Sequence, residues 1–401
     1  MKKIIKIIFL TLVSVSVTAQ GTWTQKASLT GPGRDQLVSF SIGTKGYLGT
    51  GQNATSTYLK DFWEYDQTTN TWSQKANFGG TERYNATGFS IGNKGYIVAG
   101  HDINNLYVND LWEYDPITNN WTQKSSFPGV GRRGAVGFSI GNKGYFGTGL
   151  DGSSIDHQDF YEYNPSTDIW TQKANFGGVA RHFAVGFSIG NKGYIGTGAA
   201  SGNQLQDFWE YDTLANAWTQ KANFGGIARY SATSFSIGSK GYIGTGWGTG
   251  ITLFNDFWEY NPSTNLWVQE TNFGGTARYT AAGFSIGSKG YIGSGGDNIT
   301  GYTQDLWEFS PINPTSIKEQ TATNNIKILP NPNNGNFIIE FNSEKNFIYQ
   351  LDVYDNLGDL VYKTEINDSK TKINLSSLNK GLYFLKILDG KQNHIEKVVI
   401  D

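Results

Sequence analysis

Six arginines recur along this chain of 401 residues at steps of 48 or 49 residues. They are Arg34, Arg83, Arg132, Arg181, Arg229 and Arg278. A guanidinium group binds a carboxylate or a sulfate through two hydrogen bonds at once, so this series could hold an acidic ligand. We expect the residues that follow five of these arginines to lie beside the same site, and these are Tyr84, Arg133, His182, Tyr230 and Tyr279. The alternative is that the six arginines pair with repeated Asp or Glu residues and only tie the structure together.

Trp247 is a second candidate binding residue. Eleven of the 12 tryptophans fall on repeated positions and are expected in the core, whereas Trp247 alone does not. An exposed tryptophan suits stacking on a sugar ring or a hot spot for a protein partner, and filling a gap in the core is the alternative. Asp102, Asp151 and Asp297 share one loop position. We expect them to be turn formers rather than ligands.

Signals for an enzyme are scarce. The four histidines (His101, His157, His182 and His394) do not have the spacing of metal ligands, and there is no cysteine. No nucleophile elbow, phosphate-binding loop or dinucleotide motif stands in the right context. A net charge of −2 argues against a nucleic-acid partner. The sequence therefore predicts no catalytic residue, metal site or cofactor, and it favours a binding protein over an enzyme.

The repeat that carries these residues predicts an all-β fold. Each unit has short apolar segments separated by glycine-containing turns, as in 184–189, 194–198, 208–211 and 218–220. Four strands in about 50 residues are typical of a blade of a β-propeller, because helical repeats need a 3.6-residue period that is absent here. A glutamate recurs once per unit, and six copies of one carboxylate indicate a structural role: Glu64, Glu113, Glu162, Glu210, Glu259 and Glu308.

The strand count predicts how the ring of six units closes. A strand around Trp23 precedes the first arginine, and no equivalent strand follows Glu308 and Phe309. We therefore expect Gly21–Ala27 to complete the last blade, because closure removes unpaired strand edges. In such blades the fourth-to-first and second-to-third connections emerge on one face. We expect ligand recognition on that face, since the second-to-third loops vary between the repeats.

The units resemble kelch repeats. The matching features are the arginine near the start, the glycines of the second strand and the segment from Glu113 to Trp121. The family's Gly-Gly doublet is replaced, for example by Gly-Ser-Gly-Gly at Gly293 to Gly296. The resemblance implies a six-bladed β-propeller over residues 20–310, with the arginines around the channel mouth, where kelch propellers bind acidic partners. Kelch-like propellers also include a sugar isomerase and a sugar oxidase, so a carbohydrate-active enzyme is the alternative function.

The N-terminal segment predicts export. Lys2, Lys3 and Lys6 form a basic start that overlaps an apolar run at 4–17, and small residues follow up to Ala19. This layout is typical of a signal peptide over residues 1–19. No later segment reaches the ~18 apolar residues of a membrane span.

The tail after residue 310 differs in composition from the repeats. Residues 311–325 have the polar character of a linker, and several strands follow in 326–401. This last segment resembles a type IX secretion C-terminal sorting domain, a small β-sandwich. The residues that carry the resemblance are Pro330, Asn331, Pro332, Gly335, Gly381 and Tyr383. The alternative is an immunoglobulin-like module that binds carbohydrate or protein.

Together these features predict an exported protein, secreted or attached to the outer-membrane surface, that is a monomer. The tail would be recognised by the type IX secretion machinery, and the propeller would bind a glycan or a protein. A purely structural surface protein is a further alternative.

Overall fold

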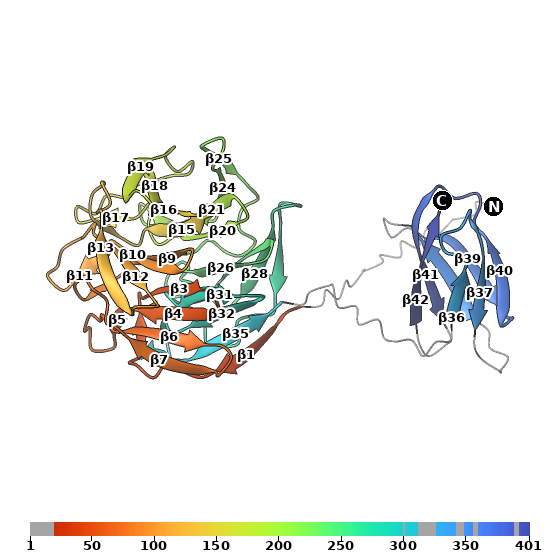
Figure 1. The fold of residues 1–401 in the computed structure, drawn as a ribbon, viewed down its shortest axis with the longest axis horizontal. Coiled ribbons are helices and arrows are strands. Elements are labelled where there is room, and N and C mark those ends of the chain that lie inside the picture. The colour runs from red at the N-terminus through yellow and green to blue at the C-terminus, as the bar shows by residue number, and fades with distance from the viewer. Residues whose placement is uncertain (1–19, 300, 312–325, 342–348, 356–359, 389–392) are drawn as a thin grey trace, which may run out of the picture. The chain divides into compact units, whose positions relative to one another are not determined.

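The computed structural model describes residues 20–299, 301–311, 326–341, 349–355, 360–388 and 393–401. It divides into two compact units, Met1–Ile312 and Asn313–Asp401 (Figure 1). All elements of the described residues are strands, so the all-β prediction is confirmed. The expected signal peptide and residues 312–325 of the expected linker lie outside the described residues. Within the described part of the chain, no helix has the length and apolarity that a membrane crossing requires.

The first unit is a propeller of six antiparallel four-stranded blades (Figure 1). Blade 1 consists of β3 (Val38–Ile42), β4 (Lys45–Gly49), β6 (Phe62–Asp66) and β7 (Thr71–Lys75). Blade 2 consists of β9 (Thr87–Ile91), β10 (Lys94–Val98), β12 (Leu111–Asp115) and β13 (Asn120–Lys124). Blade 3 consists of β15 (Val136–Ile140), β16 (Lys143–Gly147), β18 (Phe160–Asn164) and β19 (Ile169–Gln172). Blade 4 consists of β20 (Val185–Ile189), β21 (Lys192–Gly196), β24 (Phe208–Asp212) and β25 (Ala217–Gln220). Blade 5 consists of β26 (Thr233–Ile237), β27 (Lys240–Gly244), β28 (Phe257–Asn261) and β29 (Leu266–Glu270).

Blade 6 contains strands from both ends of the propeller sequence. It consists of β31 (Ala282–Ile286), β32 (Lys289–Gly293), β35 (Leu306–Ser310) and β1 (Thr22–Lys26). The first strands of the six blades contact one another in a closed circle, and β3 touches both β9 and β31.

The N-terminal strand closes the ring, as the strand count predicts. Trp23 lies opposite Phe309 in the β1–β35 ladder, and its Nε1 donates a hydrogen bond to the Thr271 carbonyl at 3.1 Å. Its ring also makes edge contacts with Phe257 and Phe273, with centroids 5.0 and 5.1 Å away. One residue therefore joins the last blade to the one before it, and the edge of β35 is covered.

Close packing between blades explains many of the 51 glycines. A Cβ on Gly95 would lie 2.3 Å from the nearest atom of the Phe40 ring, which projects from the preceding blade. No real side chain tolerates this contact, so only glycine lets the aromatic ring lie flat on the next sheet. The same crowding occurs at the equivalent positions Gly46, Gly144, Gly193, Gly241 and Gly290.

The repeated glutamates have the structural role that the sequence indicates. The hydroxyl of Tyr47 on β4 donates a hydrogen bond of 2.5 Å to Glu64 on the neighbouring β6. Equivalent bonds from a tyrosine on the second strand reach Glu113, Glu162, Glu210, Glu259 and Glu308.

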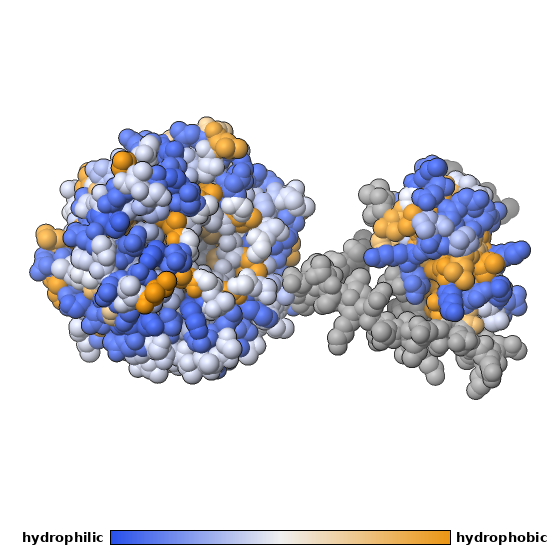
Figure 2. All heavy atoms as spheres, in the orientation of Figure 1, coloured by the Kyte–Doolittle hydropathy of each residue, from blue (hydrophilic) through white to orange (hydrophobic). Residues whose placement is uncertain are grey.

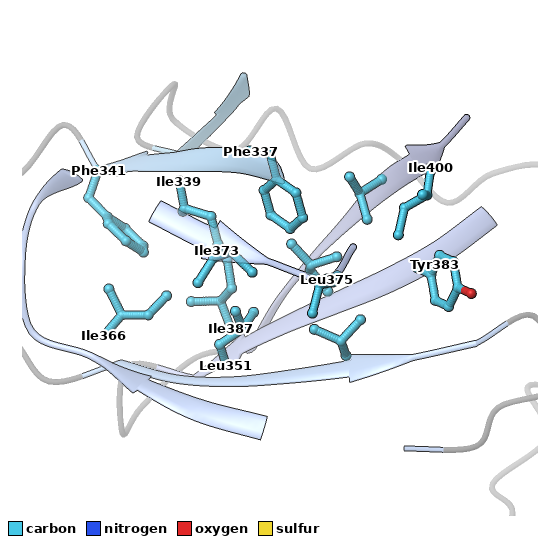
Figure 3. Packing of buried hydrophobic residues seen from close by; sticks show 13 residues of the cluster. Phe337, Ile339, Phe341, Leu351, Ile366, Ile373, Leu375, Tyr383, Ile387 and Ile400 are labelled. Carbon is cyan, nitrogen blue, oxygen red and sulfur yellow. The ribbon is translucent and has the colours of Figure 1, made fainter. Parts of the chain in front are cut away.

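The second unit is a small sandwich of two antiparallel sheets. One sheet holds β36 (Ile326–Leu329), β37 (Asn336–Phe341) and β40 (Lys370–Asn374). The other holds β39 (Leu360–Ile366), β38 (Tyr349–Tyr354), β41 (Gly381–Leu388) and β42 (Asn393–Ile400). Between them lies a separate apolar core that includes Phe337, Ile339, Leu351 and Ile387 (Figure 3). The sequence did not predict β40, whose alternation of Lys and Thr with a single buried Ile373 is a weak apolar pattern.

Candidate functional site

Two kinds of connection meet on one face of the propeller, as expected. Residues of four connections between blades pair with the following second-to-third loop in a short ladder, as Arg83–Tyr84 (β8) does with His101–Asp102 (β11). The other ladders are β2 (Arg34–Asp35) with β5 (Gln52–Asn53), β14 (Arg132–Arg133) with β17 (Leu150–Asp151), and β30 (Arg278–Tyr279) with β33 (Gly296–Asp297). The connections that enter blades 4 and 5 make single bridges, His182 with Ala199 and Tyr230 with Trp247. We call this surface, formed by 27–37, 50–61 and their repeats, the axial face. Figure 2 shows apolar residues gathered around the hollowed centre of the propeller.

Five backbone hydrogen bonds join successive connections around the axis on this face. Each connection has a residue with positive φ just before the first strand of its blade, and the amide of Asn85 donates to the Gln36 carbonyl at 2.8 Å. The same bond continues from Gly134 to Asn85, from Phe183 to Gly134, from Ser231 to Phe183 and from Thr280 to Ser231. We call these six residues the mouth ring (Gln36, Asn85, Gly134, Phe183, Ser231 and Thr280). Their bonds fix the backbone next to the residues that directly precede them, among them Tyr84, Arg133 and His182. These positions were not predicted from the sequence, although each lies two residues after a repeated arginine.

The six repeated arginines are buried, so the expectation that they bind a ligand needs correction. Arg83 is 1% exposed, and its guanidinium donates to Asp110 Oδ1 at 2.6 Å and to Oδ2 at 2.9 Å. A third bond goes to the Ala99 carbonyl at 3.0 Å. The equivalent pairs are Arg34–Asp61, Arg132–Asp159, Arg181–Asp207, Arg229–Asp256 and Arg278–Asp305. The Nε of Arg83 donates to the Thr81 carbonyl and its Nη2 to the Thr81 hydroxyl, both at 3.1 Å, so all five N–H groups have acceptors within the protein. Because the six arginines are buried and paired with aspartates, the structural alternative describes them.

Electrostatics agrees with this role. Burial alone would raise the pKa of Asp61, but the hydrogen bonds and charge of Arg34 outweigh it and hold that pKa below its usual value. The backbone of each arginine also links two blades, because the amide of Gly51 donates to the Arg83 carbonyl at 2.8 Å. The aspartates were missed in the sequence, yet they recur with the same step, 26 or 27 residues after each arginine.

Arg133 differs from the six repeated arginines. Among the described residues it is the arginine of this face without a carboxylate partner; its Nη1 donates to the Tyr84 hydroxyl at 2.8 Å. Its guanidinium lies 5.7 Å from the Tyr84 ring centre and 5.5 Å from that of Tyr107. The Tyr84 hydroxyl in turn lies 2.8 Å from His101 Nδ1. Burial and the charge of Arg133 hold the pKa of His101 below its usual range.

Three aromatic side chains, those of Tyr230, Trp247 and Tyr279, lie together on the axial face at blades 5 and 6. The half-buried Trp247 stacks on Tyr230, with ring centres 6.1 Å apart and planes 11° apart. Its other neighbour is Tyr279, at 4.8 Å. The backbones of Trp247 and Tyr230 exchange two hydrogen bonds, and Trp247 Nε1 donates to the Gly250 carbonyl at 2.8 Å. Each ring therefore keeps a fixed orientation, and part of Trp247 remains exposed.

His182 belongs to a histidine–aspartate pair between blades 3 and 4. Its Nδ1 lies 2.5 Å from Asp156 Oδ1, and its ring contacts Phe183 of the mouth ring at 4.9 Å. Beside the pair is an open hollow of about 590 Å³, lined in part by Asp156, Ala200 and Leu205. His182 was predicted from the sequence as a site residue, but Asp156 was not, because it lies in a variable loop.

Asp35 occupies the position that Tyr84 and Arg133 hold in later repeats, and it is completely buried. Its Oδ2 accepts a hydrogen bond of 3.1 Å from the Gln36 side chain, whereas its Oδ1 has no partner among the described residues. Burial raises the pKa of Asp35 to about 6. Asp35 was not predicted as a site residue, although it is an acidic residue at a position where the other repeats have an aromatic or basic one.

The three loop aspartates are turn formers. Asp102 Oδ1 accepts hydrogen bonds from the amides of Asn104 and Leu106, at 3.0 and 2.9 Å. Asp151 and Asp297 accept equivalent pairs of backbone bonds. Within the described ranges, no three His, Asp or Glu side chains come together in a way that could hold a metal ion.

The motif residues of the second unit fasten its last strand. The Asn331 side chain donates to the Lys397 carbonyl at 2.7 Å and accepts from the Val399 amide at 2.9 Å. Gly335 has a φ of 89°, and a Cβ there would lie 2.6 Å from the Ser376 backbone. The Tyr383 hydroxyl donates to the Asn379 carbonyl at 2.7 Å, and Gly381 begins β41. Pro330 and Pro332 flank Asn331.

Comparisons with known proteins agree with both units. Residues 11–195 match the family described as the KLHDC2/KLHL20/DRC7 Kelch-repeats domain, and residues 327–401 match the secretion system C-terminal sorting domain. Among solved structures, the "Structure of YjhT" aligns with a TM-score of 0.61, at 17% identity, over 70% of this chain and 95% of that one. At such low identity the likeness concerns the fold alone. A comparison with curated protein sequences finds no match.

Proposed function

The chain is a kelch-type β-propeller followed by a secretion system C-terminal sorting domain, and from this we propose that it is an exported protein whose axial face binds a glycan. The sorting domain supports passage through the type IX secretion machinery to the cell surface or the medium. The propeller is then the part that meets ligands outside the cell.

The aromatic group of Tyr230, Trp247 and Tyr279 carries the proposal. Aromatic rings bind the apolar faces of sugars, and such sites need a rigid, partly exposed ring. Trp247 fits this requirement because its two aromatic neighbours and its hydrogen bond to Gly250 fix it. It also stands outside the repeated core positions, so blade packing of the repeat does not require it.

Arg133 supports the same site. A guanidinium without a carboxylate partner, on a face where the other six arginines have one, is available for a carboxylate, sulfate or hydroxyl group of the ligand. The cost of ordering it is small, since Tyr84 and Tyr107 already hold it in place.

The test is binding of the exported protein to an array of neutral and acidic oligosaccharides, followed by calorimetry with the best hit. Trp247→Ala should weaken binding by tenfold or more, on the order expected for the loss of a ring stacked on a sugar. Trp247→Phe should retain most of the affinity. Leu214→Ala is a matched control, because this residue is 87% exposed on a turn of the opposite face. Unchanged binding by Trp247→Ala would refute the proposed site, and turnover of the bound sugar would make the protein an enzyme.

A protein ligand is the second candidate, and one observation favours it. Eight aliphatic side chains on connections of the axial face are at least half exposed: Ile103, Leu106, Val130, Ile155, Val179, Ile227, Ile251 and Ile299. Exposed apolar residues concentrated on one face mark protein interfaces, whereas sugars prefer aromatic rings. A double substitution, Ile227→Ser with Ile299→Ser, separates the two: it should abolish protein binding and leave glycan binding intact.

A further inference from the structure

His182 has one ring nitrogen committed to the fold and the other open. A carboxylate only accepts hydrogen bonds, so Nδ1 carries the proton that it donates to Asp156 Oδ1 over 2.5 Å. In the neutral ring, Nε2 then has a free lone pair. No described residue bonds to Nε2, and the two side chains remain 19% and 16% exposed. At a pH at which the ring is neutral, the pair therefore presents a hydrogen-bond acceptor to solvent.

The position of this acceptor is fixed before any ligand arrives. The backbone of His182 exchanges two hydrogen bonds with Ala199, of 3.0 and 2.9 Å. Its ring packs edge-on against Phe183, which belongs to the mouth ring. The adjoining hollow is lined in part by Asp156 and Ala200, so a ligand that enters it meets the carboxylate that holds the His182 ring. Little conformational entropy would be lost when the pair binds a partner.

We propose that His182 Nε2 accepts a hydrogen bond from a hydroxyl group of the ligand, and that Asp156 is the residue that positions it. The inference deepens the glycan-binding function proposed above and rests on it. The carboxylate charge behind the ring disfavours an anionic group at this point and favours a neutral hydroxyl. Arg133, one connection earlier, has the opposite preference. The face therefore suits a polyhydroxylated ligand whose acidic group, if it has one, lies towards blade 3.

The same loop contains a matched control. His157 Nε2 lies 3.0 Å from Asp151 Oδ2, and Asp151 also accepts the amide hydrogen bonds that shape the loop. This second pair has the same composition, but its aspartate is a turn former of the variable loop. His157→Ala therefore removes a histidine from the loop without touching the proposed acceptor.

The first experiment measures affinity for the best oligosaccharide of the array and for its deoxy analogues. His182→Ala should bind about tenfold more weakly, as the loss of one hydrogen bond predicts, and it should no longer distinguish one deoxy analogue from the parent sugar. Asp156→Ala should also weaken binding, but less, because the proton of the His182 ring is then no longer held on Nδ1. Asp156→Asn should restore part of the affinity, since its amide oxygen still accepts from Nδ1. His157→Ala should bind like the parent protein.

The second experiment observes the ring itself. With ¹⁵N-labelled histidine, the resonance of the unprotonated Nε2 of His182 should move when the oligosaccharide is added, and that of His157 should not. Full affinity in His182→Ala, together with lost binding in Trp247→Ala, would overturn this inference and leave the proposed function standing. If no oligosaccharide binds the parent protein, both fail.

Discussion

Arg83 and Asp110 are joined by two hydrogen bonds of 2.6 and 2.9 Å, and the same pair recurs in every blade of the propeller. The arginine lies in the connection that enters the blade, and the aspartate precedes its third strand. The Ala99 carbonyl, which completes the set of acceptors, belongs to a non-glycine residue with a φ of 64°. The pair therefore fixes a connection and a strained loop at once.

Arg83→Ala should lower the free energy of unfolding by about 3 kcal/mol, because a carboxylate in a largely buried site loses its charge partner. Urea unfolding of the propeller measures this. Lys60→Ala is the control, since Lys60 and Glu82 form an exposed pair that contributes less than about 1 kcal/mol. Equal effects of the two substitutions would contradict the structural role of the arginine.

Asp35 should make the propeller less stable as the pH rises from about 4 to about 6. Its folded pKa of about 6 lies above the reference value of 3.8, so the folded protein holds the proton over this window while the unfolded chain has lost it. Folding stability is lost through the window, by roughly 3 kcal/mol at most. Asp35→Asn mimics the protonated form. It should therefore match the parent protein at pH 4 and exceed its stability at pH 7.5, as thermal unfolding at both pH values would show. A variant less stable than the parent at pH 7.5 would contradict this.

Removal of residues 20–28 should lower the melting temperature of the propeller by roughly 10 °C or more, because β35 loses its partner strand and Trp23 leaves a cavity. Differential scanning calorimetry of chains beginning at residue 20 or 29 measures the effect. Trp23→Ala alone should produce a large part of it. An unchanged melting curve after the deletion would show that the ring does not depend on this strand.

Removal of residues 326–401 should abolish export and leave the propeller's melting temperature unchanged, since each unit has its own apolar core. Cell fractionation in a host with a type IX system measures export. Asn331→Ala tests the motif within the intact chain: it removes both side-chain hydrogen bonds from Asn331 to β42 and should reduce export while the propeller stays folded. Export of the truncated chain at the parent level would contradict the sorting role.

Much of the fold could be predicted because one unit is repeated. The period of 48 or 49 residues and the four apolar segments predict the blades, and the unmatched strand at Trp23 predicts the closure. Composition and spacing suffice here, since turns and strand alternation are local properties. The roles of the repeated glutamates and loop aspartates were predicted for the same reason.

The site depended on contacts that the sequence does not display. In the sequence, six equivalent arginines resemble a ring of ligand-binding residues. In the structure, each one is paired with an aspartate 26 or 27 residues away, so burial and pairing exclude these arginines from the ligand site. Arg133 and His182 differ from their neighbours only through distant partners, Tyr84 and Asp156. The sequence by itself determined the repeat, its closure and the sorting motif. Only the tertiary structure decided which polar groups remain available to a ligand, because availability depends on what the fold brings within hydrogen-bond distance.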